Sequence, residues 1–131
     1  SLIDTLQQFT GQVVFVTHIN HPNEISMPNQ AVFRSLSSQG FRLFTQSVLL
    51  KRVNDNAQLL ADLSKKLFDN HIVPYYLHRL DKVEGAAHFD LCPDESCRIY
   101  KRLGELLPGY LLPVMVEEIP GRSSKTPVCC D

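Results

Sequence analysis

The sequence predicts an α/β fold with a parallel sheet, on two observations. Four short apolar runs have the length and composition of buried strands, and they cover residues 13–17, 41–45, 72–77 and 111–116. Segments with helical spacing separate these runs, and strands that alternate with helices form parallel sheets through right-handed crossovers. The 131 residues are enough for one hydrophobic core, so we expect residues 1–131 to form a single domain.

The first two connections between these runs carry helix signals. Residues 28–39 hold apolar residues at helical spacing, and Gly40 behind them suits the C′ position that ends a helix. Residues 59–68 carry leucines at the same spacing, and Asn54 or Asp55 is the expected N-cap. We therefore expect one helix after each of the first two strands.

Two more helices are expected near the ends of the chain. Pro93 fits the first turn of a helix that Pro108 and Gly109 end, and residues 2–9 have the pattern of another helix before the first strand. About four strands are too few to close a barrel of the usual size. The sheet is therefore either a small open one or the trailing part of a longer protein.

Composition and charge argue against several classes of partner. The formal net charge is −1, and no basic stripe points to a nucleic acid. No apolar stretch approaches the length of a membrane span, and no signal peptide opens the chain. We expect a cytoplasmic protein with neither a nucleic acid nor a membrane as partner.

The four cysteines match no known framework. Cys92, Cys97, Cys129 and Cys130 have the spacing of neither a zinc site nor a disulfide scaffold, and the adjacent pair is a poor chelate. We expect free thiols in a reducing compartment, and we expect no metal ligands in this chain.

Polar or ionisable residues follow each apolar run. They are His18 after the first run, Gln46 after the second, His78 and Asp81 after the third, and Glu117 and Glu118 after the fourth. The carboxyl ends of parallel strands lie at one edge of a sheet, and ligands bind there. The sequence therefore predicts a site at this edge.

Five motifs connect these positions to a known family. They are THINHPNE at residues 17–24, NDN at residues 54–56, PYYLHRLD at residues 74–81, GAAHF at residues 85–89 and IPGRSSKTP at residues 119–127. In this order and spacing, the chain resembles the lysine 2,3-aminomutase family over nearly its whole length. The resemblance is closest to the branch that makes β-lysine for the modification of elongation factor P.

The resemblance implies a fold and a reaction. The fold is a partial parallel (β/α) barrel, the C-terminal part of a radical S-adenosylmethionine-type barrel. The reaction is the isomerisation of the small-molecule substrate L-lysine to β-lysine, in which the α-amino group moves to the β-carbon. Members of the family use pyridoxal phosphate, S-adenosylmethionine and a [4Fe–4S] cluster.

The resemblance also assigns site residues. Lys125 matches the lysine that forms the internal aldimine with pyridoxal phosphate, and His18 and Gln46 match residues that line the S-adenosylmethionine and cofactor pocket. Asp81 and Glu118 match the two acids that hold the amino end of the substrate. An amine must be neutral to attack an aldehyde, and carboxylates bind ammonium groups through charge-assisted hydrogen bonds.

The chain departs from the family pattern in several places. The three-cysteine cluster motif is absent, so we expect the cluster ligands and the first half of the barrel to lie outside this chain. We expect a C-terminal fragment that does not turn over alone, and an exposed half-barrel capable of homo-oligomerisation. Arg122-Ser123-Ser124 replaces a glycine run, and Glu118 replaces an aspartate.

Composition alone favours plainer readings. Lys125 would be a solvated surface lysine in a polar tail. His18, His21 and Asp81 would suit a metal-dependent hydrolase, although a satisfied loop histidine is the better interpretation of His21. A small-ligand-binding α/β module is a further alternative. Tyr75 and Tyr76 should alternate across a strand, with one in the core and the other toward the cofactor.

Overall fold

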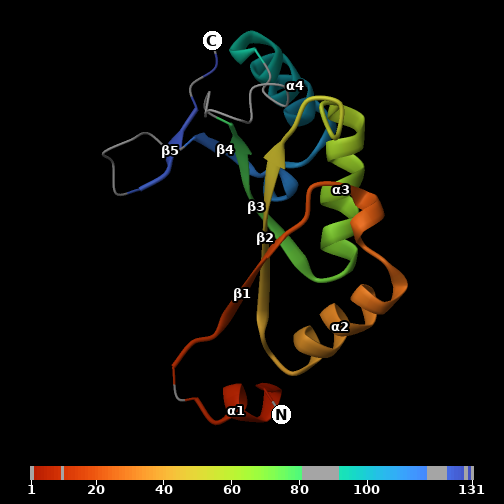
Figure 1. The fold of residues 1–131 in the computed structure, drawn as a ribbon, viewed down its shortest axis with the longest axis vertical. Helices are drawn as coiled ribbons and strands as arrows, with labels where there is room; N and C mark the ends of the chain where they lie inside the picture. The colour runs from red at the N-terminus through yellow and green to blue at the C-terminus, as the bar shows by residue number, and fades with distance from the viewer. Residues whose placement is uncertain (1, 10, 81–91, 118–123, 129, 131) are drawn as a thin grey trace.

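A computed structural model shows the fold of the chain (Figure 1). It describes residues 2–9, 11–80, 92–117, 124–128 and 130. The elements, in chain order, are α1 (Leu2–Gln7), β1 (Val14–His18), the 3₁₀ turn η1 (Pro22–Glu24), α2 (Met27–Ser38), β2 (Arg42–Leu49), α3 (Ala57–Asp69), β3 (Ile72–Arg79), α4 (Pro93–Leu106), the 3₁₀ turn η3 (Gly109–Leu111), β4 (Val114–Glu117) and β5 (Thr126–Pro127).

The strands form one open sheet in the order β1-β2-β3-β4-β5. The first four are parallel, and β5 pairs with β4 in the antiparallel direction. Because parallel crossovers are right-handed, strands adjacent in chain order place their connecting helices on the same side. Figure 1 shows α2 and α3 on one side of the sheet. The predicted α/β class with a parallel sheet is confirmed, whereas the sheet does not close into a barrel.

The hydrophobic core lies between the sheet and α3 and α4. Along β2, alternate residues are buried, beginning with Leu43, and they face the leucines of α3. Leu77 and Met115 continue this buried layer on β3 and β4, where they are register partners. Each strand therefore has one face in the core and one face directed away from the helices.

The helix boundaries agree with the predicted signals, with one exception. Gly40 has φ of +89° directly after the C-cap of α2, as the C′ prediction requires. Pro93 begins α4. The predicted N-cap of α3 is wrong, because Asn56 holds that position and its Oδ1 accepts the N–H of Leu59 at 3.0 Å.

The end of the chain contains two features that were not predicted. The segment after Lys125 forms the short strand β5, where four strands were expected. Cys97 and Cys130 form a disulfide, which corrects the expectation of free thiols for this pair, whereas Cys92 is exposed and unpaired. Both features depend on contacts with another segment of the chain, so the local sequence does not mark them. None of the helices among the described residues combines the length and the apolar composition needed to cross a bilayer.

Candidate functional site

Several residues predicted for the site lie on the side of the sheet opposite the described helices, and we call this side the open face. Val14, Val16 and His18 alternate on the exposed side of β1. Phe44 and Gln46 lie on the same side of β2, because they are the register partners of Val16 and His18. Apolar and polar side chains thus share a face that none of the described helices covers.

Gln46 and His78 make the central polar contact of this face. The Nε2 atom of His78 lies 3.3 Å from Oε1 of Gln46, and the neighbour of Gln46 on β1 is His18. His18 is the last residue of β1, as predicted. Gln46 does not end its strand, because β2 continues to Leu49. The polar residues predicted at the carboxyl edge of the sheet therefore extend inward from that edge along the open face.

A β-bulge places two tyrosines side by side on the open face. The register shifts between Thr45 and Gln46, so Thr45 pairs with Pro74 and Gln46 pairs with Tyr76, and Tyr75 has no partner. The rings of Tyr75 and Tyr76 stack at 3.8 Å, and their hydroxyls are 3.0 Å apart. The prediction that one ring enters the core is wrong, because the bulge removes the alternation.

Lys125 approaches this aromatic pair from the neighbouring segment. It is half-buried, and its Nζ atom lies 5.6 Å from the centroid of the Tyr76 ring, within the range of a cation–π contact. Thr126 and Pro127 hold the segment by pairing with Glu117 and Val116 of β4. The amine therefore points to the open face. Composition alone predicts a solvated surface lysine, and the structure differs from that prediction.

The tyrosine pair has an electrostatic consequence. The hydrogen bond to Tyr76 raises the pKa of Tyr75 above its usual value, burial adds to this rise, and the charge of Lys125 opposes it. Tyr75 therefore keeps its proton over the neutral pH range and is uncharged beside the lysine.

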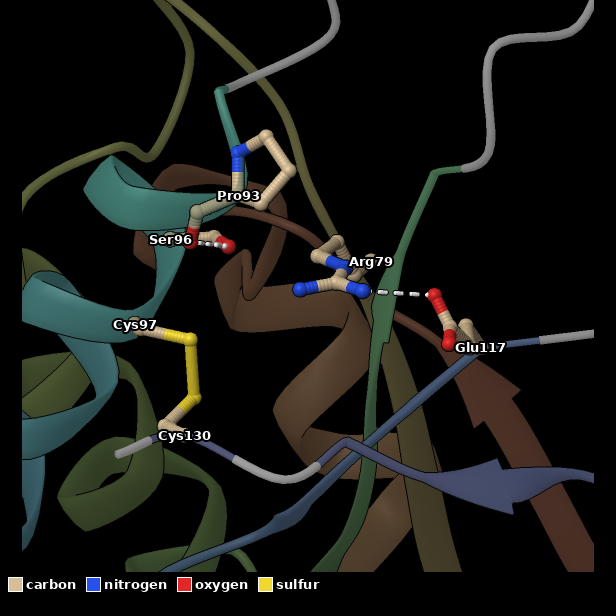
Figure 2. A network of polar contacts seen from close by, with 6 residues as sticks. All are labelled: Arg79, Pro93, Ser96, Cys97, Glu117 and Cys130. Atoms are coloured by element: carbon tan, nitrogen blue, oxygen red, sulfur yellow. Dashed lines mark hydrogen bonds and ion pairs between the residues drawn. A yellow bond between two sulfur atoms is a disulfide. The ribbon is translucent and has the colours of Figure 1, made fainter.

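The predicted substrate acids, Asp81 and Glu118, lie outside the described residues. The residues that precede them at the strand ends are described, and they form an ion pair. Nη2 of Arg79 lies 2.7 Å from Oε2 of Glu117, with both side chains largely shielded from solvent (Figure 2). The carboxyl ends of β3 and β4 are thereby joined directly.

Comparison with known proteins identifies the family. No family model matches the chain. L-lysine 2,3-aminomutase of Escherichia coli (strain K12) is 48% identical over 128 residues, which cover 98% of this chain and 37% of that protein. L-lysine 2,3-aminomutase of Haemophilus influenzae is 52% identical over 115 residues, which cover 88% of this chain and 34% of that protein.

A more distant relative agrees. L-lysine 2,3-aminomutase of Clostridium subterminale is 37% identical over 112 residues, which cover 86% of this chain and 27% of that protein. The chain belongs to the lysine 2,3-aminomutase family. It spans about a third of the length of these relatives.

The metal-hydrolase alternative finds no support in the residues of this aminomutase-family chain that the structure describes. His21 caps η1, and its Nδ1 accepts the N–H of Asn23 at 3.1 Å, which agrees with the interpretation of His21 as a satisfied loop histidine. Within the described ranges, no three histidine, cysteine or acidic side chains come together to hold an ion. Asp81, the third residue of that alternative, lies outside these ranges.

Sequence reasoning missed two contributors to the site. The sequence predicts only that His78 lies near a strand end, yet it contacts Gln46 and lies edge-on to Tyr76 with ring centroids 6.0 Å apart. The contact between Tyr76 and Lys125 is likewise not predicted by the sequence. The two consecutive tyrosines were the available signal, but only the register of β2 against β3 shows that they lie together.

Proposed function

We propose that this chain is part of an isomerase that converts L-lysine to β-lysine by moving the 2-amino group to carbon 3. One observation carries the proposal. The amine of Lys125 lies over the Tyr76 ring on the open face of a parallel sheet, in a chain 48% identical to an L-lysine 2,3-aminomutase. Lys125 is the residue that we assign to the attachment of the cofactor.

The residues around Lys125 suit pyridoxal phosphate. A primary amine can bind the aldehyde group covalently, and a flat aromatic pair offers a surface for the pyridine ring. Gln46 and His78 supply hydrogen-bonding groups on the same face. When bound, the cofactor supplies an electron-accepting ring for carbon–nitrogen chemistry. The protein residues position the amine and provide polar contacts.

The arrangement of strands supports a partial barrel. Strands in chain order with their helices on one side are the repeating unit of a (β/α) barrel, whose active site lies at the carboxyl ends of the strands. The matched relatives are about three times as long as the matched region. We infer that the rest of such a protein completes the barrel and covers the open face.

Asp81 and Glu118 remain our candidates for binding the substrate's amino end. Their carboxylates have the charge that an ammonium-bearing substrate requires. The ion pair between Arg79 and Glu117 joins the two strands that lead to these acids. Loss of either acid should raise KM for lysine about 10–100-fold, as expected for a charge-assisted hydrogen bond.

The finer assignments rest on the motif resemblance. We propose that S-adenosylmethionine binds near His18 and Gln46, and that the product serves the modification of elongation factor P. No group of residues in the described ranges fits a [4Fe–4S] cluster. We assign no step of the cluster's chemistry to this chain.

The test is an aminomutase assay of the complete enzyme that the proposal implies. Lys125→Ala should abolish the conversion of L-lysine to β-lysine, measured by chromatographic separation of the two isomers. Lys65→Ala is the matched control, because Lys65 is an exposed lysine on α3 away from the open face. Activity that survives Lys125→Ala at the level of the control would contradict the proposal.

A further inference from the structure

The Cys97–Cys130 disulfide joins α4 to the segment that carries Lys125. The two Cα atoms are 5.5 Å apart, a usual separation for bonded cysteines, although 33 positions separate them in the chain (Figure 2). Both residues are half-buried and pack against the hydrophobic core. Cys92 lies just before the same helix, exposed and unpaired.

Few other described contacts hold the end of the chain. Strand β5 has two residues, and it pairs with β4 through Thr126 and Pro127. The N–H of Val128 donates to the carbonyl of Met115 at 2.9 Å. So short a strand, at the edge of the sheet, opens readily when nothing else constrains it. The disulfide fixes the C-terminal end of this segment through Cys130.

We propose that Cys97 and Cys130 are a redox modification site whose oxidation state controls how firmly the Lys125 segment is held. In the oxidised form the disulfide anchors the segment, and Lys125 stays over the Tyr76 ring. In the reduced form the segment keeps the short β4–β5 pairing, the Val128 hydrogen bond and the packing of Val128 against the core, but it loses its covalent anchor to α4. The amine then samples positions away from the open face.

The oxidant is a small-molecule disulfide. One cysteine thiolate attacks it, forms a mixed disulfide and releases one thiol. The second cysteine thiolate then attacks the protein sulfur of the mixed disulfide, forms the Cys97–Cys130 bond and releases the second thiol. The two protein thiols are oxidised and the small disulfide is reduced to two thiols.

Partial burial is what makes this pair suitable for reversible chemistry. A sulfur sealed in the core is inert, whereas a half-buried one can be reached by a small thiol or disulfide. In a reducing compartment, which the sequence led us to expect, disulfides are usually transient and redox-sensing. The link to cofactor attachment rests on the proposed function; the anchoring does not.

Amide hydrogen exchange tests the anchoring directly. The Val128 amide should be protected in the chain oxidised with oxidised glutathione, and it should lose that protection when dithiothreitol reduces the same protein. Cys97→Ser should lose the protection even under oxidising conditions. Cys92→Ser, the matched control on the same stretch of chain, should keep it.

Two outcomes would overturn the proposal. One is Val128 protection that is the same in the oxidised and reduced parent protein, which requires no variant and so does not depend on how a variant folds. The other is a disulfide map by mass spectrometry in which Cys97 is bonded to a different cysteine. If pyridoxal phosphate fails to attach to Lys125 in either redox state, the proposed function fails, while the exchange data still decide the anchoring.

Discussion

At the scale of single residues, Asn54 shows how one buried side chain fixes the positions of the strands that carry the site. Its exposed fraction is 1%, and its Nδ2 donates to the carbonyls of Asn20 and Val48, both at 2.8 Å. Its Oδ1 accepts the N–H of Leu50 at 2.7 Å. These bonds join the chain after β1 to the end of β2. They therefore set the relative positions of the strands that carry His18 and Gln46.

Asn54→Ala should lower the free energy of unfolding by about 2–4 kcal/mol, because it leaves three backbone groups without their partner, each worth about 1 kcal/mol or more when buried. Urea unfolding followed by circular dichroism measures the change. Asn56→Ala removes only the N-cap of α3 and should cost about 1 kcal/mol. Equal destabilisation by the two substitutions would show that the Asn54 bonds do not brace the strand ends.

At the scale of the elements, local signals predicted the helices well and the end of the sheet poorly. Gly40 and Pro93 mark helix ends through their own backbone preferences, so the sequence alone was sufficient there. Asn54, Asp55 and Asn56 are all competent caps, but Asn54 bonds to three backbone groups elsewhere and Asp55 accepts the N–H of Arg52. Local composition therefore could not single out the true cap.

Three features of the site depend on contacts between separate segments of the chain. The bulge at Tyr75 arises from the register of β2 against β3. Strand β5 exists only through its pairing with β4, and the Cys97–Cys130 bond requires α4 to lie beside the chain end. The family motifs predict Lys125 as a site residue, but only the three-dimensional arrangement shows its contact with Tyr76.

The ion pair between β3 and β4 gives a prediction at this scale. Arg79→Gln should lower the free energy of unfolding by about 1–2 kcal/mol, because the partner carboxylate of Glu117 is largely shielded and loses a charge-assisted hydrogen bond. Arg102→Gln is the matched control, since Arg102 and Glu105 form an exposed pair on α4 that should contribute less than about 0.5 kcal/mol.

Urea unfolding at low and high salt completes this comparison. The effect of Arg79→Gln should persist at high salt, because shielded pairs are screened less than exposed ones. An effect no larger than that of Arg102→Gln would indicate that the pair does not hold the two strand ends together.

At the scale of the whole molecule, the open face is the feature that requires an explanation. Val14, Val16, Val73 and Val114 are 39–48% exposed on strands of one sheet. Monomeric proteins seldom leave a contiguous apolar surface of this kind uncovered. This exposure supports our proposal that a larger barrel encloses the site. Enclosure would exclude water from the surroundings of Lys125 and protect a reactive intermediate.

Mapping the site of cofactor attachment tests the central claim most directly. The chain is mixed with pyridoxal phosphate, reduced with borohydride, digested and sequenced by mass spectrometry. We predict that the pyridoxyl group is found on Lys125, and that Lys125→Ala removes it whereas Lys65→Ala does not. A pyridoxyl group spread over the exposed lysines, and unchanged by Lys125→Ala, would contradict the account.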